Sequence, residues 1–346
     1  MLAVLPRTIA TDPLAERRRF LGLAGLAAAG LAALPTTDGL ADAAPAADRP
    51  NKRDIAILRF LAAMELIETD LWQQYAELAV GNPGFREALE AIDDDLPVYT
   101  VDITEDELSH AQFINAYLRS IGERPVDLDP FRVVPPPRVR GLRQVPRLTN
   151  LTDLTVDTSY YTRYQSTRNP DFGATFPQIA TIREQPAIPT SDGLSERALA
   201  GIARVAAFHF PSIEQGGTSL YDQFVPLVGG KDVLRIVSSI YATEAIHYAI
   251  FRDSLTGVTA FRSGDGKLVV PDLTEGKHGS AHVMPKRCDF LDQRLPTCSV
   301  IRPSSRAKAG AQAAAAFLTA YNLFEGQSDG FFKALATLAK AADSVG

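Results

Sequence analysis

The sequence predicts an all-α fold, a four-helix bundle made of two similar helix pairs with insertions, and three observations support this prediction. Four segments repeat apolar residues at intervals of three and four, which is the spacing of an amphipathic helix. Clusters of glycine and proline separate those segments. A set of acidic, histidine and tyrosine positions occurs once in each helix pair. With 46% apolar residues in a length of 346, the chain can bury a large core.

The N-terminal residues predict an export signal. Three arginines at positions 17–19 lead directly into the alanine-rich apolar stretch 22–34, and together they resemble a twin-arginine-type signal peptide. We expect residues 1–43 to be this signal and residues 44–52 to be a linker, which leaves no membrane span in the mature chain. The protein would then be exported, to the periplasm or outside the cell. An uncleaved N-terminal anchor is the alternative.

The first helix pair, residues 54–121, opens a mature domain that spans residues 53–346. Its first helix should end at the Gly-Asn-Pro-Gly sequence that follows residue 80. The second helical stretch covers residues 85–120, with an interruption near Pro97, and Gly and Pro residues end it. The pair is therefore two long segments joined by a short turn.

The rest of the domain alternates insertions with helices. Residues 126–192 are rich in Pro, Thr, Asn and Asp and lack helical spacing, which predicts loops and short strands. A second helix pair follows at residues 195–255, and a second irregular insertion at residues 256–305. The Ala- and Leu-rich residues 306–342 predict a fifth helix that packs outside the bundle.

The same set of polar positions occurs in both helix pairs. The first helix of each pair contains Ile-Glu and, seven residues after that Glu, a Tyr, whereas the second helix contains Glu-x-x-His. The residues are Glu68, Tyr75, Glu107 and His110 in the first pair, and Glu214, Tyr221, Glu244 and His247 in the second. Because residues three apart lie on one face of a helix, each Glu-x-x-His can direct both side chains at one ion.

These acids recur on helix faces that are otherwise apolar. The face on the first helix consists of Leu58, Leu61, Glu65, Glu68, Trp72 and Tyr75. Several acids in a core would be severely destabilising unless they were protonated or paired with cations. Four carboxylates and two neutral imidazoles balance the charge of two divalent ions, since carboxylates can bridge two ions while imidazoles cap them. The pattern therefore predicts a two-metal site.

In its four helices, the chain resembles the ferritin-like superfamily, in particular exported or stress-associated bacterial members with long insertions. The resemblance implies a pair of iron or manganese ions, with Glu107 and Glu244 as the bridging carboxylates. It also implies hydrogen bonds from Tyr75 and Tyr221 around the metals. The ligands that it implies are Glu68, Glu107, His110, Glu214, Glu244 and His247.

Glu65 is a further candidate ligand, because it lies on the same helix face as Glu68. Its counterpart in the second helix pair is Pro211, which cannot bind a metal, so internal symmetry favours Glu68. Pro211 also predicts a kink in its helix. The bare backbone of Gly216 and Gly217, just after the Glu of that helix, could leave room above the metals for a small oxidant or an ion path.

Single motifs also have structural interpretations. Thr104-x-x-Glu107 is a capping-box pattern, in which Glu107 would only close the start of a helix. His209 lies outside the repeated pattern, and we expect it to be a satisfied core or surface histidine. It is the joint occurrence of two Glu-x-x-His motifs in equivalent helices that favours the metal interpretation.

The second insertion contains two pairs of residues that could carry chemistry. Cys288 and Cys298 lie close together in the sequence, so in an oxidising compartment we expect them to form one disulfide that closes a short loop. His278 and His282 share a Gly- and Ser-containing segment with no predicted helix, so we expect them not to bind metal.

The resemblance implies oxidoreductase or metal-handling chemistry with oxygen or peroxide. A di-iron oxidase or ferroxidase-like activity ranks first and manganese catalase-like chemistry second. The alternative is a non-enzymatic stress- or desiccation-associated envelope protein that uses the bundle as a scaffold. A formal charge of −6 provides no basic stripe, so we expect no nucleic-acid partner. The sequence identifies neither the substrate nor the oligomeric state.

Overall fold

The computed structural model of the chain describes residues 49–163, 177–274 and 310–344. Some sequence predictions fall outside these residues and stay predictions: the export signal (residues 1–43), His278, His282, Cys288 and Cys298. Within the described ranges, no helix combines the length and the hydropathy that a membrane span requires.

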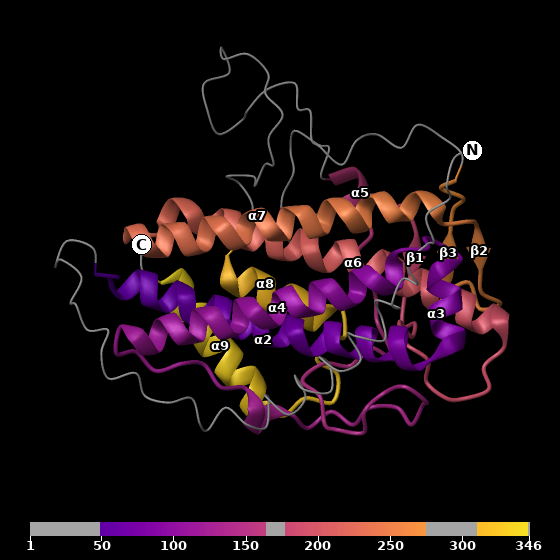
Figure 1. The fold of residues 1–346 in the computed structure, drawn as a ribbon, viewed down its shortest axis with the longest axis horizontal. Coiled ribbons are helices and arrows are strands. Elements are labelled where there is room, and N and C mark those ends of the chain that lie inside the picture. Colours follow the sequence, from indigo (N-terminus) through magenta and orange to yellow (C-terminus); the bar gives the residue numbers. More distant parts are fainter. Residues whose placement is uncertain (1–48, 164–176, 275–309, 345–346) are drawn as a thin grey trace, which may run out of the picture. The chain divides into compact units, whose positions relative to one another are not determined.

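Four long helices form the bundle and confirm the predicted all-α fold (Figure 1). They are α2 (Lys52–Gly81), α4 (Leu96–Ser120), α6 (Glu196–Phe224) and α7 (Lys231–Ser254). The closest packing is within each predicted pair, α2 against α4 and α6 against α7. The two halves of the repeated pattern are therefore also two structural units of the bundle.

The side chain of Asp54 connects the two helix pairs at the start of α2. Asn51 caps this helix by accepting from the backbone N–H groups of Arg53 and Asp54, and the Asp54 carboxylate accepts from Asn51 N in return. The same carboxylate accepts from Gly229 N at 2.8 Å and Gly230 N at 3.0 Å, directly before α7. The beginnings of α2 and α7 are thereby held together.

The short helix α3 (Pro83–Glu90) precedes α4, so the predicted interruption lies at residues 91–95. Pro97 occupies the first turn of α4, where its missing N–H group would have no intrahelical partner. Thr104 lies inside this helix, and its hydroxyl donates to Thr100 O at 2.6 Å. The capping-box interpretation of Thr104 and Glu107 is therefore wrong.

Helix α6 continues through Pro211. The first insertion contacts this segment: the Tyr160 hydroxyl donates to Phe208 O at 3.1 Å, and the Ser212 hydroxyl donates to Asp157 O at 3.2 Å. The insertion thus holds α6 in place just before its Glu-x6-Tyr motif.

The two insertions meet in one small antiparallel sheet of strand order β1-β3-β2. Thr181 of the first insertion pairs with Val269 of the second, and Phe261 pairs with Val270. The elements of the insertions and of the turns beside them are η2 (Asp129–Phe131), α5 (Tyr160–Arg163), β1 (Thr181–Ile182), η3 (Val225–Leu227), η4 (Leu255–Gly257), β2 (Phe261–Arg262) and β3 (Leu268–Val270). The prediction of irregular, β-containing insertions is confirmed.

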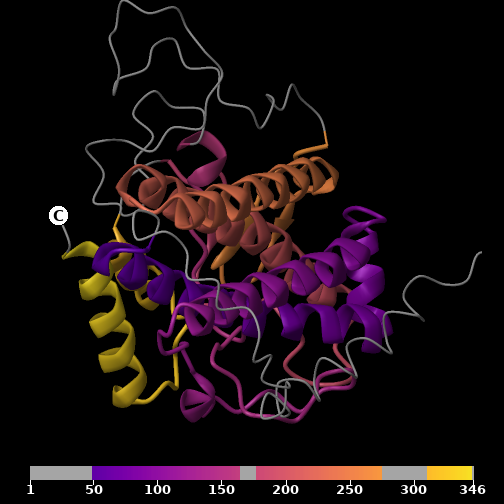
Figure 2. The same ribbon diagram turned by 60° about the vertical axis from the view of Figure 1, so that its left-hand side comes forward.

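The C-terminal region differs from its prediction. In place of one helix over residues 306–342 there are two, α8 (Ala311–Ala320) and α9 (Asp329–Asp343), coloured yellow in Figure 2. Asn322 and Gly326 adopt positive φ angles of 66° and 84° between them, a conformation that ends a helix. As predicted, this region packs outside the four-helix bundle, with α9 against α2 and α8 against α9 and α6.

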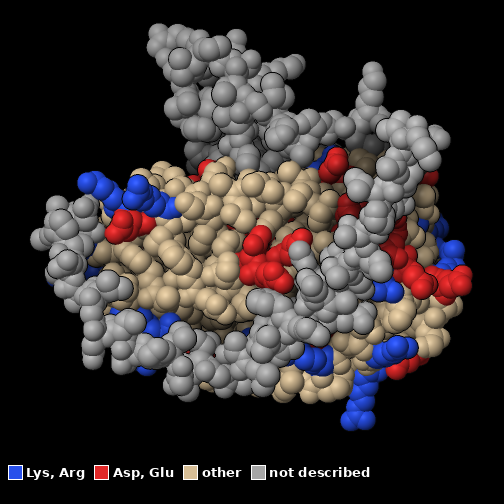
Figure 3. Space-filling model, viewed as in Figure 1, with Lys and Arg blue, Asp and Glu red and all other residues tan. Residues whose placement is uncertain are grey.

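The face of the molecule seen in Figure 3 carries acidic side chains near its middle, over the region where α4 and α7 lie. Asp106 of α4 has a half-exposed carboxylate that contacts His247 of α7. The acids described next, in contrast, are buried.

Candidate metal centre

Seven acidic and histidine side chains converge at the centre of the bundle. They are Glu65 and Glu68 from α2, Glu107 and His110 from α4, Glu214 from α6, and Glu244 and His247 from α7. All seven are buried. Their ligand atoms form three overlapping groups, in each of which the atoms lie within 4.8 Å of one another. The structure thus brings together all six ligands that the sequence analysis named, and Glu65 as well.

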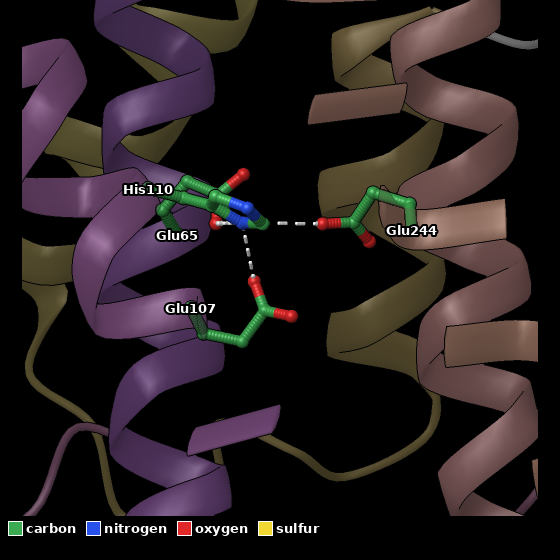
Figure 4. A group of neighbouring side chains, drawn as sticks. All are labelled: Glu65, Glu107, His110 and Glu244. Carbon is green, nitrogen blue, oxygen red and sulfur yellow. Dashed lines mark hydrogen bonds and ion pairs between the residues drawn. The ribbon is translucent and has the colours of Figure 1, made fainter. Parts of the chain in front are cut away.

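The first group consists of Glu65, Glu107, His110 and Glu244 (Figure 4). Nδ1 of His110 lies 3.1 Å from Glu107 Oε2, 3.4 Å from Glu65 Oε2 and 3.6 Å from Glu244 Oε1. Figure 4 shows Glu244 extending towards the imidazole from the other helix pair. One imidazole nitrogen and three carboxylates therefore surround a volume in which an ion could be bound.

The second group consists of Glu107, Glu214 and His247. Nδ1 of His247 lies 3.0 Å from Glu107 Oε1 and 3.3 Å from Glu214 Oε2. Glu107 thus directs one oxygen at each histidine, and Glu244 is likewise shared, between the first group and a third that contains Glu68 and Glu214. A bridging carboxylate requires this arrangement.

The positions of Glu65 and Glu68 change the balance between these two candidates. Glu65 lies beside His110, whereas Glu68 lies with Glu214 and Glu244. Internal symmetry favoured Glu68, but Glu65 is the acid of α2 that approaches a histidine. The equivalent position of α6 is Pro211, which cannot bind a metal, so the internal symmetry gave no support to Glu65.

Many polar atoms of this cluster are fully buried and have no hydrogen-bond partner among the residues that the structure describes. They are Glu65 Oε2, Glu68 Oε1, Glu107 Oε1, both oxygens of Glu214 and of Glu244, and His247 Nδ1. The last lies close to Glu107 Oε1 but out of hydrogen-bond alignment. Buried polar atoms without partners are rare and costly in proteins. Divalent cations would provide partners for these atoms, so the residues fit bound metal.

The pKa values of four carboxyl groups in the cluster are raised, which reflects the same shortage of partners for buried charge. Burial, opposed by His110, raises the pKa of Glu65 to about 7, and burial, opposed by His247, raises the pKa of Glu214 to about 7. Burial and neighbouring carboxylates raise the pKa values of Glu68 and Glu244 well above their usual range.

Glu107 and the two histidines shift in the direction of the charged forms. Burial would raise the pKa of Glu107, but the two adjacent imidazoles lower it to about 2. Burial would lower the pKa of His110, but Glu107 and Glu65 raise it to about 11. Without metal, the cluster therefore retains protons that bound cations would displace.

Asp106 orients one of the histidines. Its Oδ2 lies 3.0 Å from Nε2 of His247, on the side of the ring away from the cluster. A carboxylate in this position fixes the ring and its tautomer, so that Nδ1 faces the site. Asp106 was not predicted from the sequence. The signal was its place directly before Glu107, where the second repeat has Thr243.

The two tyrosines of the repeat have different partners. Tyr221 donates its hydroxyl to Oε1 of Glu65, which agrees with its predicted role beside the ligands. Tyr75 differs from the prediction, because its hydroxyl lies 2.7 Å from Nδ1 of His209. Burial lowers the pKa of His209 to about 3, so this imidazole is neutral and can accept from Tyr75. His209 is a satisfied core histidine, as predicted.

Aromatic rings close one end of the cluster. Trp72, Phe210 and Phe251 each lie one helical turn from a cluster residue in the sequence, and their ring centroids are 4.9–5.0 Å apart. Since all three rings are fully buried, they exclude water from this end of the site.

A pocket of about 50 Å³ lies beside the cluster, between α2, α6 and α8. Glu65, Glu68, Gly216 and Gly217 are among the residues that line it, so the predicted room at the two glycines exists. A Cβ atom at Gly217 would lie 2.1 Å from Glu244 Oε2, a distance that no real contact permits. A side chain at residue 217 would therefore displace the carboxylate of Glu244 from its position in the cluster.

Comparison with known proteins identifies one family. The family model described as ferritin-like domain matches residues 53–257, which include all seven cluster residues and end before α8. No curated protein and no solved structure matches the chain.

Proposed function

Since the chain belongs to the ferritin-like domain family, we propose that its seven clustered side chains bind two divalent metal ions, iron or manganese. The observation that carries the proposal is the sharing of Glu107 between the groups of His110 and His247, together with the carboxylate oxygens that have no partner. Such a donor set suits a carboxylate-bridged pair.

The residues divide into two ligand sets around common bridges. Glu65 and His110 would hold one ion, and Glu214 and His247 the other, with Glu107 and Glu244 shared between them. Glu68 is a seventh donor on the side of the pocket. Tyr221 holds the carboxylate of Glu65, and Asp106 holds the ring of His247. These two contacts orient the ligands before any ion binds.

The chemistry that we propose is oxidation with a small oxidant, oxygen or peroxide. Bound iron or manganese supplies the redox capacity. The chain's own contribution is to hold the ligands, to exclude water through the layer of Trp72, Phe210 and Phe251, and to leave a pocket open beside Glu65 and Glu68. We rank a di-iron oxidase or ferroxidase-like activity first and manganese catalase-like chemistry second.

Elemental analysis of the protein, isolated after maturation in its native cell envelope, tests this proposal. We expect two equivalents of iron or manganese per chain, lost together in Glu107→Ala and in Glu244→Ala because these variants remove shared ligands. We also propose that residues 1–43 are an export signal, and the mass of the same sample would show whether they are cleaved or retained as an N-terminal anchor.

Two histidine variants provide the matched control. His247→Ala should lower the metal content strongly, whereas His209→Ala should leave it near the wild-type value, since both residues are buried but only His247 belongs to the cluster. Equal losses would contradict the ligand assignment. A wild-type protein without metal would instead favour the non-enzymatic scaffold.

A further inference from the structure

Helix α7 carries a seam of side chains on its outer face, away from the bundle centre. The members of this α7 seam follow one another at alternating intervals of four and three, and each is exposed or partly exposed: Arg235, Ser239, Ala242, Ile246, Ala249 and Asp253. Ile246 is 59% exposed, more than any other large apolar side chain in the described part of the chain. Because alternating intervals of four and three are the spacing with which one helix packs against another, the α7 seam has the pattern of a packing surface.

Opposite charges occupy the two ends of the α7 seam. Arg235 lies near the start of the helix and Asp253 near its end, and neither forms an ion pair with another described residue. Between them, Figure 3 shows an area over the middle of α7 without acidic or basic side chains. Eighteen helical positions, about 27 Å, separate the two residues, so they cannot pair within one chain. Their charges can complement each other only between two chains.

The position of Asp253 is unfavourable within a single chain. Asp253 lies in the last turn of α7, where a negative charge meets the negative end of the helix dipole. Other acids lie nearby: burial raises the pKa of Tyr99, and so do the charges of Asp95, Asp93 and Asp253, which places these three carboxylates around one hydroxyl. A guanidinium group from a second molecule would relieve both unfavourable interactions, which supports an intermolecular role for Asp253.

Two-fold symmetry makes the α7 seam complementary to itself. Its members form three pairs at equal distances on either side of position 244: Arg235 with Asp253, Ser239 with Ala249, and Ala242 with Ile246. When two copies of α7 pack antiparallel across an axis at this position, the members of each pair come to lie opposite each other in different chains. The small Ala242 then faces the large Ile246 of the second copy, so that the two helix surfaces can interdigitate.

We propose that the α7 seam is the interface of a homodimer, in which the seams of two copies of the chain pack antiparallel. An Arg235–Asp253 ion pair between the chains lies at each end, and small and apolar side chains lie between the two pairs. Because one helix face buries little surface, the dimer is reversible, with a dissociation constant on the order of 10 µM. The interface does not depend on bound metal, since the cluster residues of α7 point into the bundle.

An exchange of the two charges tests this interface. Sedimentation equilibrium of the protein isolated from its native cell envelope, at about 1–300 µM, should show a dimer fraction that rises with concentration. Arg235→Glu and Asp253→Arg each place like charges at both ends of the interface and should weaken the dimer about tenfold or more. The double variant restores opposite charges between the chains, so its dissociation constant should return to within about threefold of the wild-type value. No pairing within one chain can produce this recovery, because the two positions are too far apart.

A matched pair of apolar positions on α7 provides the control. Ile246→Glu places a charge at the middle of the interface and should abolish the dimer. Leu234 is also an exposed apolar residue, 41% exposed, but it lies about 120° further round the helix, so Leu234→Glu should leave the dimer unchanged. All substituted positions are exposed, and circular dichroism checks that each variant folds. A wild-type protein that stays monomeric, a dimer that survives both charge reversals, or a double variant without recovery would each overturn the proposal.

Discussion

Helix α2 carries two groups of buried acids that look alike in the sequence and differ in their surroundings. Glu65 and Glu68 face the centre of the bundle, whereas Asp70 and Glu77 contact the first insertion. None of the four is more than 7% exposed. The degree of burial therefore does not distinguish them.

The acids that face the insertion are fully paired. Asp70 accepts from Leu148 N at 3.0 Å, from Thr149 N at 2.9 Å and from the Thr149 hydroxyl at 2.7 Å, and it also pairs with Arg132. Two arginines, Arg143 and Arg147, donate to Glu77 at 2.5 Å. The insertion thus supplies the cations that balance these carboxylates.

Within the described part of the chain, no arginine pairs with the acids that face the bundle centre. Five carboxylates share two imidazoles there, and most of their oxygens have no hydrogen-bond partner among the described residues. A buried acid therefore indicates a metal site only when the protein itself supplies too few cations and hydrogen-bond donors to satisfy it. Three predictions test this distinction.

The largest effect is expected from Arg147→Met. Arg147 is 1% exposed and bonds Glu77, so its loss leaves a buried carboxylate with only the partly exposed Arg143. We expect the free energy of unfolding to fall by about 3–5 kcal/mol. The metal content of the folded protein should stay unchanged. Denaturant unfolding and elemental analysis measure the two quantities.

A double variant separates a structural ion pair from a functional one. Replacing Glu77 by Leu in the Arg147→Met background removes the unpaired charge and should recover most of the lost stability. A loss of metal in either variant would show that the two faces of α2 are coupled. It would contradict the distinction between acids that face the bundle centre and acids that face the insertion.

The second prediction concerns the stability of the metal-free protein between about pH 5 and pH 8. Folding raises the pKa of Glu65 and of Glu214 from 4.5 to about 7, so the folded chain retains protons that the unfolded chain has lost. His110, with its pKa raised from 6.5 to about 11, acts in the same direction. Stability should therefore fall as the pH rises, by about 1–3 kcal/mol across this range.

The pKa of Glu107 is shifted in the opposite direction, to about 2. This group titrates below pH 5, so it does not change the direction in which stability varies between about pH 5 and pH 8. Bound metal should abolish the decline, because the cations displace the protons. Glu214→Gln should reduce the slope in the metal-free protein, whereas Thr149→Val, at the paired acid, should not. Urea unfolding at several pH values, with and without metal, measures this. A stability that rises with pH would contradict the shifts.

The sequence predicted the bundle and the members of the cluster, because both depend on local spacing. The Glu-x-x-His pairs place two side chains on one helix face, and repetition in equivalent helices brings the faces together. The end of α2 at Gly81 and the end of α4 at Ser120 were predicted from the Gly and Pro residues beside them.

Contacts between distant segments could not be predicted in this way. The partners of Asp70 and Glu77 come from residues 132–149, which show no periodicity that would place them. Asp106 points away from its own motif to the histidine of another helix. The break between α8 and α9 lies at Asn322 and Gly326, which adopt positive φ angles. Asn and Gly are residues that end helices, so the sequence carried this signal within an otherwise Ala- and Leu-rich segment.

The smallest effects come from a matched pair of hydroxyl deletions, one on each face of α2. Thr149→Val removes one donor to Asp70, and Tyr221→Phe removes one donor to Glu65, with little change of shape in either case. Each should lower the free energy of unfolding of the metal-free protein by about 1 kcal/mol, since each deletes one buried hydrogen bond.

Asp70 keeps Arg132 and two backbone donors, so metal affinity should not change in Thr149→Val. Glu65 loses the donor that orients it, so Tyr221→Phe should weaken metal binding by about tenfold or more. Calorimetric titration with Mn²⁺ separates the two outcomes, and equal affinities in both variants would mean that Tyr221 has only a structural role.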